Sequence, residues 1–315
     1  MGRSGLVDGA QVVNEAARAV LSLPELREER LADILLPLLG VHEPAIDLQT
    51  LHFLPIYAEE RADPKLLHSL AVGGRLDYVR YRLLDELADA AAAGEPGALS
   101  AHRLNARLAG LIRSRYRRAL SQAVWGTFFE IVAALYAGHS LSLAFDAANL
   151  RSVRSDLSLD DYLDHARARH GPARTSLDAV LLAYDGTEEE LERARESWHY
   201  CTFALQLYDD VLDFEEDLAA GKFTWTVVQA LAARGDTYGA DDAPDDPQAL
   251  RHVYRAALIQ GVLAETLKYA EAFLRRSARI AKPLFPSWVA FQEAGVKHMN
   301  SLRAEYEELA YEAWR

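Results

Sequence analysis

Four aspartates lie within nine residues of the segment QLYDDVLDFEEDLAAGK (206–222): Asp209, Asp210, Asp213 and Asp217. Three of them, Asp209, Asp213 and Asp217, follow one another at intervals of four residues, which would place them on one face of a helix. Like charges at this spacing repel and destabilise an isolated helix. A hard divalent cation would relieve the repulsion, and carboxylate oxygens are the ligands that Mg²⁺ prefers. The segment therefore predicts a magnesium site.

A second acidic cluster, Asp85, Glu86 and Asp89, occurs in the segment LLDELADA. Taken alone it is weaker, because an acidic pair on a solvated helix face is common. Two helices that directed such carboxylates toward each other could hold Mg²⁺ and share it with the oxygens of a diphosphate. The same ions would stabilise the charge on a diphosphate that leaves when its C–O bond breaks.

The elements that must position these residues are predicted to be helices throughout. Apolar residues recur at spacings of three and four, and alternating strand patterns are nearly absent. The acidic clusters fall in expected helices 64–93 and 187–218, and a further long helix is expected over 246–281. We expect residues 1–315 to form one all-α domain, with 1–61 as a helical N-terminal prefix.

Composition and charge restrict the function. The net charge of −13 argues against nucleic-acid binding, which needs a basic surface. An acidic protein that binds an anionic substrate needs bound metal or a local basic cluster. One cysteine, Cys201, allows no intrachain disulfide and fits a reducing compartment. No uninterrupted apolar run of membrane-spanning length occurs. We expect a cytoplasmic protein without stable membrane insertion, for which a homodimer is allowed.

The segment at 206–222 resembles the second aspartate-rich motif of class I terpenoid synthases, the family that includes trans-prenyl diphosphate synthases. The motif reads QxxDDxxDxxxD followed by Gly-Lys, and seven positions match it: Gln206, Asp209, Asp210, Asp213, Asp217, Gly221 and Lys222. DELAD (85–89) resembles the first motif, DDxxD, with Glu86 in place of the second aspartate. The resemblance implies an all-α bundle around an apolar cavity, with two acidic motifs at its mouth. It also implies Mg²⁺, three ions in number, and Gln206 as the residue that orients a carboxylate or a metal-bound water.

Basic residues that would hold the diphosphate are also implied by the resemblance. Prenyl synthases carry Lys-Thr-Gly where this chain has Arg169-His170-Gly171, so Arg169 is the expected equivalent of the lysine and Arg167 the alternative. Lys222 would assist. Arg303, three residues before Tyr306, resembles a C-terminal Arg-Tyr pair of bacterial cyclases, although that pair is adjacent in the family.

A second DDxxD sequence is present at 160–164 and competes with DELAD as the first metal motif. Its acidic residues are Asp160, Asp161 and Asp164. It lies only 49 residues before Asp209, and Ser158 followed by two aspartates is typical of a helix N-terminus. We therefore favour a capping role for Asp161.

Two features lead us to expect cyclisation of one prenyl diphosphate rather than chain elongation. Elongating enzymes of the family carry GGKRxRP before the first motif and an Arg-Arg pair after it, and both are missing here. The DxDD motif of protonation-initiated cyclases is also missing, so the reaction should begin with loss of diphosphate. We expect a C15–C20 substrate, with geranylgeranyl diphosphate favoured, in an apolar cavity lined by Tyr78, Tyr81, Phe203 and Trp225. Chain elongation and a non-catalytic partner subunit remain alternatives.

Overall fold

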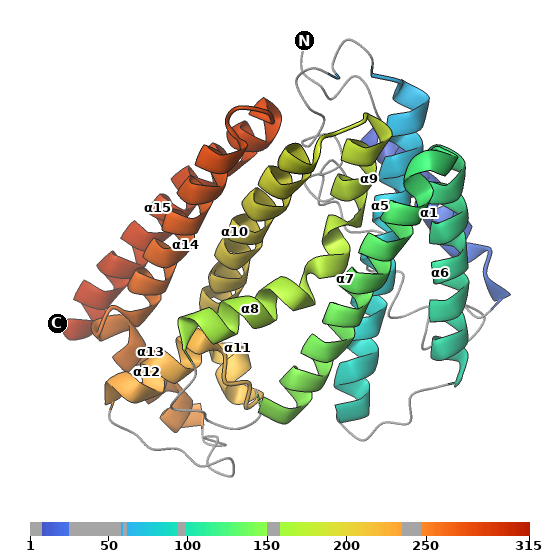
Figure 1. The fold of residues 1–315 in the computed structure, drawn as a ribbon. Helices are drawn as coiled ribbons and strands as arrows, with labels where there is room; N and C mark the ends of the chain where they lie inside the picture. The colour runs from blue at the N-terminus through green and yellow to red at the C-terminus, as the bar shows by residue number, and fades with distance from the viewer. Residues whose placement is uncertain (1–7, 25–57, 59–61, 93–98, 150–157, 235–246) are drawn as a thin grey trace. The chain divides into compact units, whose positions relative to one another are not determined.

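The computed structural model describes residues 8–24, 58, 62–92, 99–149, 158–234 and 247–315. Within these ranges the chain forms α-helices and short 3₁₀ turns, and no strand is present. The all-α prediction is therefore confirmed for the described part of the chain. The chain divides into two compact units, each assembled from separate segments (Figure 1).

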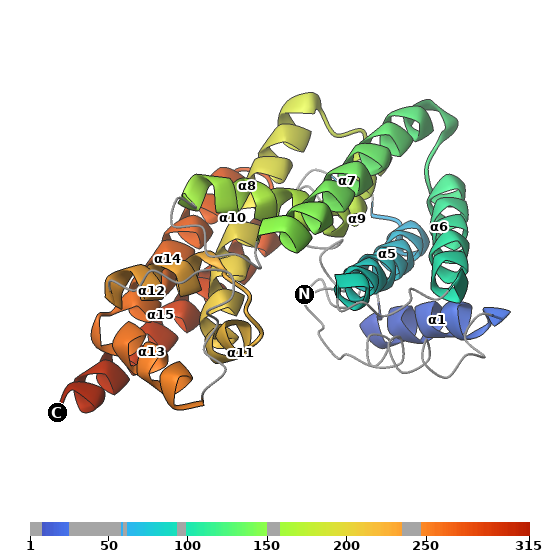
Figure 2. The same cartoon turned by 90° about the horizontal axis from the view of Figure 1, so that it is seen from below.

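Unit 1 comprises residues 1–139, 170–194 and 283–287. Its central helix is α5 (Pro64–Ala92), which contacts α1 (Gly9–Leu21), α6 (Leu99–Ala119), α9 (Thr175–Ala183) and the short turn η4 (Gly171–Arg174) (Figure 2). Gly73 of α5 allows a close approach, since a methyl group there would lie 2.8 Å from the ring of Tyr116 on α6. The first part of α7 (Gln122–Asn149) also belongs to this unit.

Unit 2 comprises residues 140–169, 195–282 and 288–315. It contains most of α10 (Glu188–Leu212) together with six further helices: α8 (Leu159–Arg169), α11 (Phe214–Ala219), α12 (Trp225–Arg234), α13 (Pro247–Ile259), α14 (Val262–Ala281) and α15 (Pro286–Trp314). A buried polar cluster joins α10, α14 and α15. Ser197 Oγ donates to the Ser277 carbonyl at 3.0 Å and accepts from Trp288 Nε1 at 2.9 Å. These directional bonds fix the register of three otherwise apolar surfaces.

Two predicted helices are interrupted. The helix expected over 187–218 ends at Leu212, and Asp213 forms a turn before α11. The helix expected over 246–281 is divided at Gly261, whose φ of 73° is left-handed and accessible to glycine at little cost. Most of the predicted prefix 1–61 lies outside the described residues, although α1 is present.

One described helix segment, Gln122–Ala144 of α7, is long and apolar enough to cross a membrane by length and composition alone. We expected no segment of this kind from the sequence, because polar residues interrupt its apolar runs. The segment is largely unburied by the rest of the chain.

Candidate functional site

The acid-rich segment at 209–217 lies at the junction of α10 and α11 in unit 2. Buried Leu207, Val211, Phe214 and Leu218 form its core-facing side. Asp209 and Asp213 are exposed, and the amide of Asp213 donates to the Asp209 carbonyl at 2.8 Å. The turn at Asp213 therefore preserves the helical spacing at this step, and the two carboxylates reach solvent from consecutive turns.

Asp210 is turned the other way, into the core, and is 1% exposed. Its Oδ1 accepts from the Tyr162 hydroxyl and from Gln206 Nε2, both at 2.8 Å. Burial raises the pKa of Asp210 to about 7, although these two hydrogen bonds oppose the rise. This placement gives Asp210 a structural role and does not support the ligand role that we predicted for it.

Asp217 is half-buried and is surrounded by charge. Burial raises its pKa to about 6; Lys222 and Arg169 lower it, whereas Asp213 raises it. Lys222 is brought back to Asp217 by the end of α11. Its amide donates to the Asp217 carbonyl at 2.8 Å and the Gly221 amide donates to Leu218 at 3.2 Å. With Gly221 at φ 64°, this is a Schellman cap, which explains why a glycine precedes the lysine.

The segment thus presents carboxylates and cations within one unit. Asp209 and Asp213 offer hard oxygen donors, and Lys222 and Arg169 offer positive charge near Asp217. Within the described part of the chain, no three His, Cys, Asp or Glu side chains form a metal site by themselves. Mg²⁺ commonly takes one or two carboxylates and completes its octahedron with water and phosphate oxygens, so this donor set fits an ion that is shared with a substrate.

The first predicted motif belongs to unit 1 and lies near the end of α5. Asp85 is 4% exposed; its Oδ1 lies 3.7 Å from His139 Nε2 and its Oδ2 lies 3.9 Å from Arg82 Nη1. Glu86 is exposed, with its Oε1 4.0 Å from Arg82 Nη2. Asp89 is in the helix, but its side chain lies outside the described residues. Asp85 is thus a buried carboxylate that already has cationic neighbours.

The two tyrosines predicted to line a cavity lie on α5 before Asp85. Tyr81 is buried, and its hydroxyl is 3.2 Å from His170 Nδ1. Its ring meets that of His139 edge-on at 5.2 Å, whereas Tyr78 is half-buried and lies 6.3 Å from Tyr81 between ring centroids. His170, which replaces the threonine of the family motif, therefore contacts the helix of the first acidic cluster.

The other predicted lining residues take part in core packing of unit 2. Phe203 is 4% exposed and packs against Leu163 and Ala166 of α8. Trp225 is 9% exposed and meets Tyr269 edge-on at 5.7 Å. A role for either residue in lining a cavity stays a prediction.

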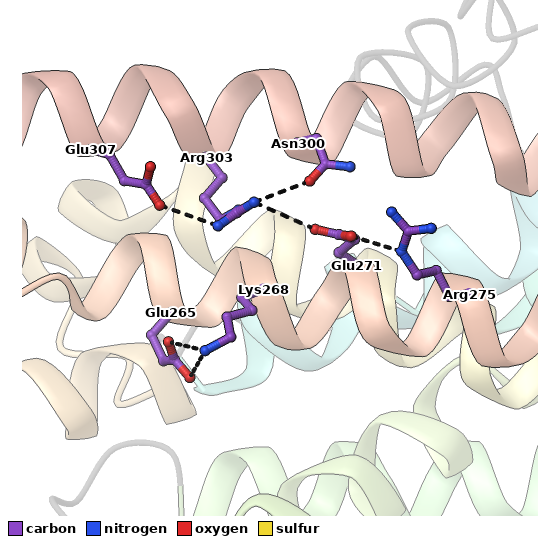
Figure 3. Close-up of polar contacts among 7 residues, drawn as sticks. All are labelled: Glu265, Lys268, Glu271, Arg275, Asn300, Arg303 and Glu307. Atoms are coloured by element: carbon purple, nitrogen blue, oxygen red, sulfur yellow. Dashed lines mark hydrogen bonds and ion pairs between the residues drawn. The ribbon is translucent and has the colours of Figure 1, made fainter.

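Two of the predicted diphosphate-binding arginines have protein partners. Arg167 Nη1 lies 3.3 Å from Asp164 Oδ1, and its guanidinium stacks 5.5 Å from the Phe203 ring. Arg303 bonds Asn300 and Glu307 on its own helix and lies 3.9 Å from Glu271 of α14 (Figure 3). Both side chains are engaged in ion pairs, so this placement favours Arg169 and Lys222 for the diphosphate.

The competing DDxxD sequence forms the start of α8. The amide of Asp161 donates to Ser158 Oγ at 3.1 Å, and that hydroxyl donates to Asp161 Oδ2 at 2.6 Å. This reciprocal pairing is a helix cap. The capping interpretation of Ser158 and Asp161 is confirmed.

Two residues near the predicted sites were missed by the sequence analysis. Tyr162 binds the Asp210 carboxylate, and His139 lies beside Asp85. A signal existed for each: Tyr162 lies two helical turns before Arg169, and His139 is an isolated titratable side chain in an apolar helix.

Comparison with solved structures identifies the fold. A geranylgeranyl pyrophosphate synthase superimposes with a TM-score of 0.71 at 14% identity, covering 92% of this chain and 97% of the synthase. A polyprenyl synthase from Caulobacter crescentus CB15, complexed with calcium and isoprenyl diphosphate, gives 0.71 at 18% identity, covering 97% and 94%. The octaprenyl pyrophosphate synthase from Helicobacter pylori gives 0.67 at 14% identity, covering 91% and 99%.

No protein-family profile matches the sequence, and no curated protein sequence matches it. At identities this low, the structural similarities establish the fold and not the activity. The chain has the all-α fold of the prenyl diphosphate synthases over most of its length.

Proposed function

We propose that this protein is a divalent-metal-dependent enzyme that acts on an allylic prenyl diphosphate. One observation carries the proposal: exposed Asp209 and Asp213 stand at a helix junction beside Asp217, which Lys222 and Arg169 approach. Carboxylates that bind Mg²⁺ and cations that bind phosphate oxygens are the two components that a diphosphate site needs.

Asp209, Asp213 and Asp217 would hold Mg²⁺, and Asp85, Glu86 and Asp89 are proposed as further ligands. The ions, three in number by resemblance, would stabilise the negative charge that develops on the departing diphosphate. Arg169 and Lys222 would bind its remaining oxygens, and Gln206 would keep Asp210 oriented toward the core so that Asp209 faces outward.

Chain elongation is the reaction that the comparisons favour. The solved structures with this fold are named as synthases of geranylgeranyl, octaprenyl and other polyprenyl diphosphates, and their folds match nearly end to end. We therefore place transfer of the allylic group to isopentenyl diphosphate ahead of the cyclisation that the sequence alone led us to expect. A C15 to C20 allylic substrate remains our expectation.

Cyclisation of a single substrate is kept as a second candidate because of the arginines of α5. A second diphosphate substrate needs its own basic pocket, and the expected basic motifs are missing from both sides of Asp85. Two arginines close to Asp85 on that helix are engaged: Arg80 Nε donates to Asn105 at 2.9 Å, and Arg82 lies beside Asp85 and Glu86. Elongation would require the pocket to be built from other residues.

One assay separates the candidates. The purified protein is incubated with Mg²⁺ and farnesyl or geranylgeranyl diphosphate, with and without isopentenyl diphosphate, and products are identified by mass spectrometry. Elongation yields a longer prenyl diphosphate only when isopentenyl diphosphate is present, whereas cyclisation yields a hydrocarbon or alcohol from the allylic substrate alone. No metal-dependent product from either mixture would favour a non-catalytic subunit. Asp209→Asn and added EDTA serve as controls and should abolish turnover.

A further inference from the structure

We propose that Tyr162 is a positioning residue for the diphosphate site: by binding the buried carboxylate of Asp210, its hydroxyl sets where α8 holds Arg169 against the acid-rich segment. The inference rests on the proposed function, because the anion that Arg169 would hold is a diphosphate. It adds a residue to the site that no motif of the sequence pointed to.

The hydrogen bonds around Asp210 form a closed triangle inside unit 2. Tyr162 is 2% exposed and its hydroxyl donates to Asp210 Oδ1 at 2.8 Å. Gln206 Nε2 donates to the same oxygen at 2.8 Å and to the Tyr162 oxygen at 3.2 Å. Thr226 Oγ1 lies 3.5 Å from Asp210 Oδ2. One carboxylate therefore joins side chains from α8, α10 and α12.

This polar contact restrains α8 in a way that its apolar contacts do not. Leu163 and Ala166 pack α8 against Phe203, and apolar packing of this kind is non-directional. A hydrogen bond to a buried carboxylate is directional and is stronger than one between neutral groups. Tyr162 should therefore fix the rotation of α8 about its own axis.

The rotation of α8 decides where Arg169, at the end of the same helix, is held. Arg169 lies seven residues after Tyr162, about 10 Å further along the helix and on nearly the same side. Arg169 is near enough to Tyr162 and to Asp217 to lower the pKa of each. A change in the rotation of α8 would move Arg169 away from Asp217 and from the anion bound there.

The test measures binding of inorganic diphosphate in the presence of Mg²⁺ by titration calorimetry, and so does not depend on turnover. Tyr162→Phe should weaken binding about tenfold, the size expected for loss of one charge-assisted bond. Arg169→Gln should weaken binding at least as much. The double variant should bind no more weakly than Arg169→Gln alone, because both changes remove the same interaction.

Tyr184→Phe is the matched control. Tyr184 is a buried tyrosine of unit 1 whose hydroxyl accepts from the Asp63 amide at 3.0 Å. Its variant should lower the thermal unfolding midpoint as Tyr162→Phe does, yet bind diphosphate like the wild type. If Tyr162→Phe does not fold, Asp210→Asn tests the same contact from the acceptor side and should show the same non-additivity with Arg169→Gln.

The outcomes are distinct. Unchanged diphosphate binding by a folded Tyr162→Phe variant, or losses that add with those of Arg169→Gln, would overturn the positioning role while leaving the proposed function standing. A wild-type protein that binds no diphosphate with Mg²⁺ would remove the proposed function itself, and the positioning role with it.

Discussion

Adjacent residues of the acid-rich segment have opposite environments because a helix turns by about 100° per residue. Asp209 faces solvent, whereas Asp210 accepts hydrogen bonds from Tyr162 and Gln206 in the core. The motif therefore combines two tasks. Exposed carboxylates are available to a metal ion, and a buried carboxylate holds the elements that surround them.

The choice of first metal motif is tested by two single substitutions. Asp85→Asn should reduce turnover by roughly a hundredfold, because it removes a proposed metal ligand. Asp161→Asn should retain nearly full turnover, since Asp161 caps α8. Steady-state rates with circular dichroism on both variants provide the measurement. An active Asp85→Asn protein beside an inactive Asp161→Asn protein would reverse the assignment.

A second buried acid, Asp77 of α5, should make stability depend on pH. It is 1% exposed and accepts from the Tyr136 hydroxyl at 2.8 Å, with Tyr116 and Arg80 also nearby. Burial raises its pKa to about 7 from an ordinary 3.8, so the folded state keeps a proton that the unfolded chain releases. The free energy of unfolding should therefore fall as pH rises between these values.

Asp77→Asn should reduce this fall, because an amide stays neutral throughout. Between pH 5.5 and 8 the difference between wild type and variant should be on the order of 2 kcal/mol. Asp210, whose pKa is also raised to about 7, supplies a residual dependence in both proteins. Urea unfolding at the two pH values measures the effect, with exposed Asp160→Asn as control. An identical fall in the wild type and Asp77→Asn would contradict the prediction.

At the scale of elements, apolar periodicity predicted most helices that the structure describes, from α5 to α15, because each buries one apolar side. The breaks at Asp213 and Gly261 were not predicted. Periodicity continues across both positions, and only the φ of 73° at Gly261 reveals why a glycine stands there. The cap at Ser158 was predictable because it depends on residues three positions apart.

The Gly-Lys pair gives a prediction about one helix end. Gly221→Ala would force a side chain into the left-handed region, at a cost of roughly 1 kcal/mol, and would loosen the turn that returns Lys222 to Asp217. We expect weaker binding of Mg²⁺-diphosphate, by about threefold to tenfold, together with a lower unfolding midpoint.

Gly261→Ala is the control for that experiment. Gly261 has a similar φ of 73°, and a methyl group there would meet no atom within 4 Å. Its substitution should cost similar stability without changing diphosphate binding. If both alanine variants bound diphosphate equally well, the turn at Gly221 would have no part in placing Lys222.

At the scale of the whole molecule, the fold was predictable and the reaction was not. The seven matched motif positions describe diphosphate binding, which elongating and cyclising enzymes share. The end-to-end similarity to polyprenyl synthases favours elongation, whereas the missing basic motifs favour cyclisation. Local spacing cannot resolve this, because a pocket for a second substrate can be assembled from residues far apart in the sequence.

The exposed surface of α7 leads to the final prediction, that a second copy of the chain covers it. Phe129 is 45% exposed and Leu141 is 73% exposed, while Phe128, His139 and Ser142 of the same helix are buried against the protein. A helix with one side already packed on protein is poorly suited to lipid, and Glu130 would be costly there. Symmetric association of identical chains is the commonest alternative.

Light scattering after size exclusion should therefore give twice the chain mass of 35.0 kDa for the wild type. Leu141→Glu should give the mass of one chain, because it would bury an unpaired carboxylate in the contact. Leu309→Glu, a change at a 44% exposed leucine of α15, should leave the mass doubled. A wild-type protein that runs as a single chain and floats with phospholipid vesicles would instead make α7 a membrane-binding helix.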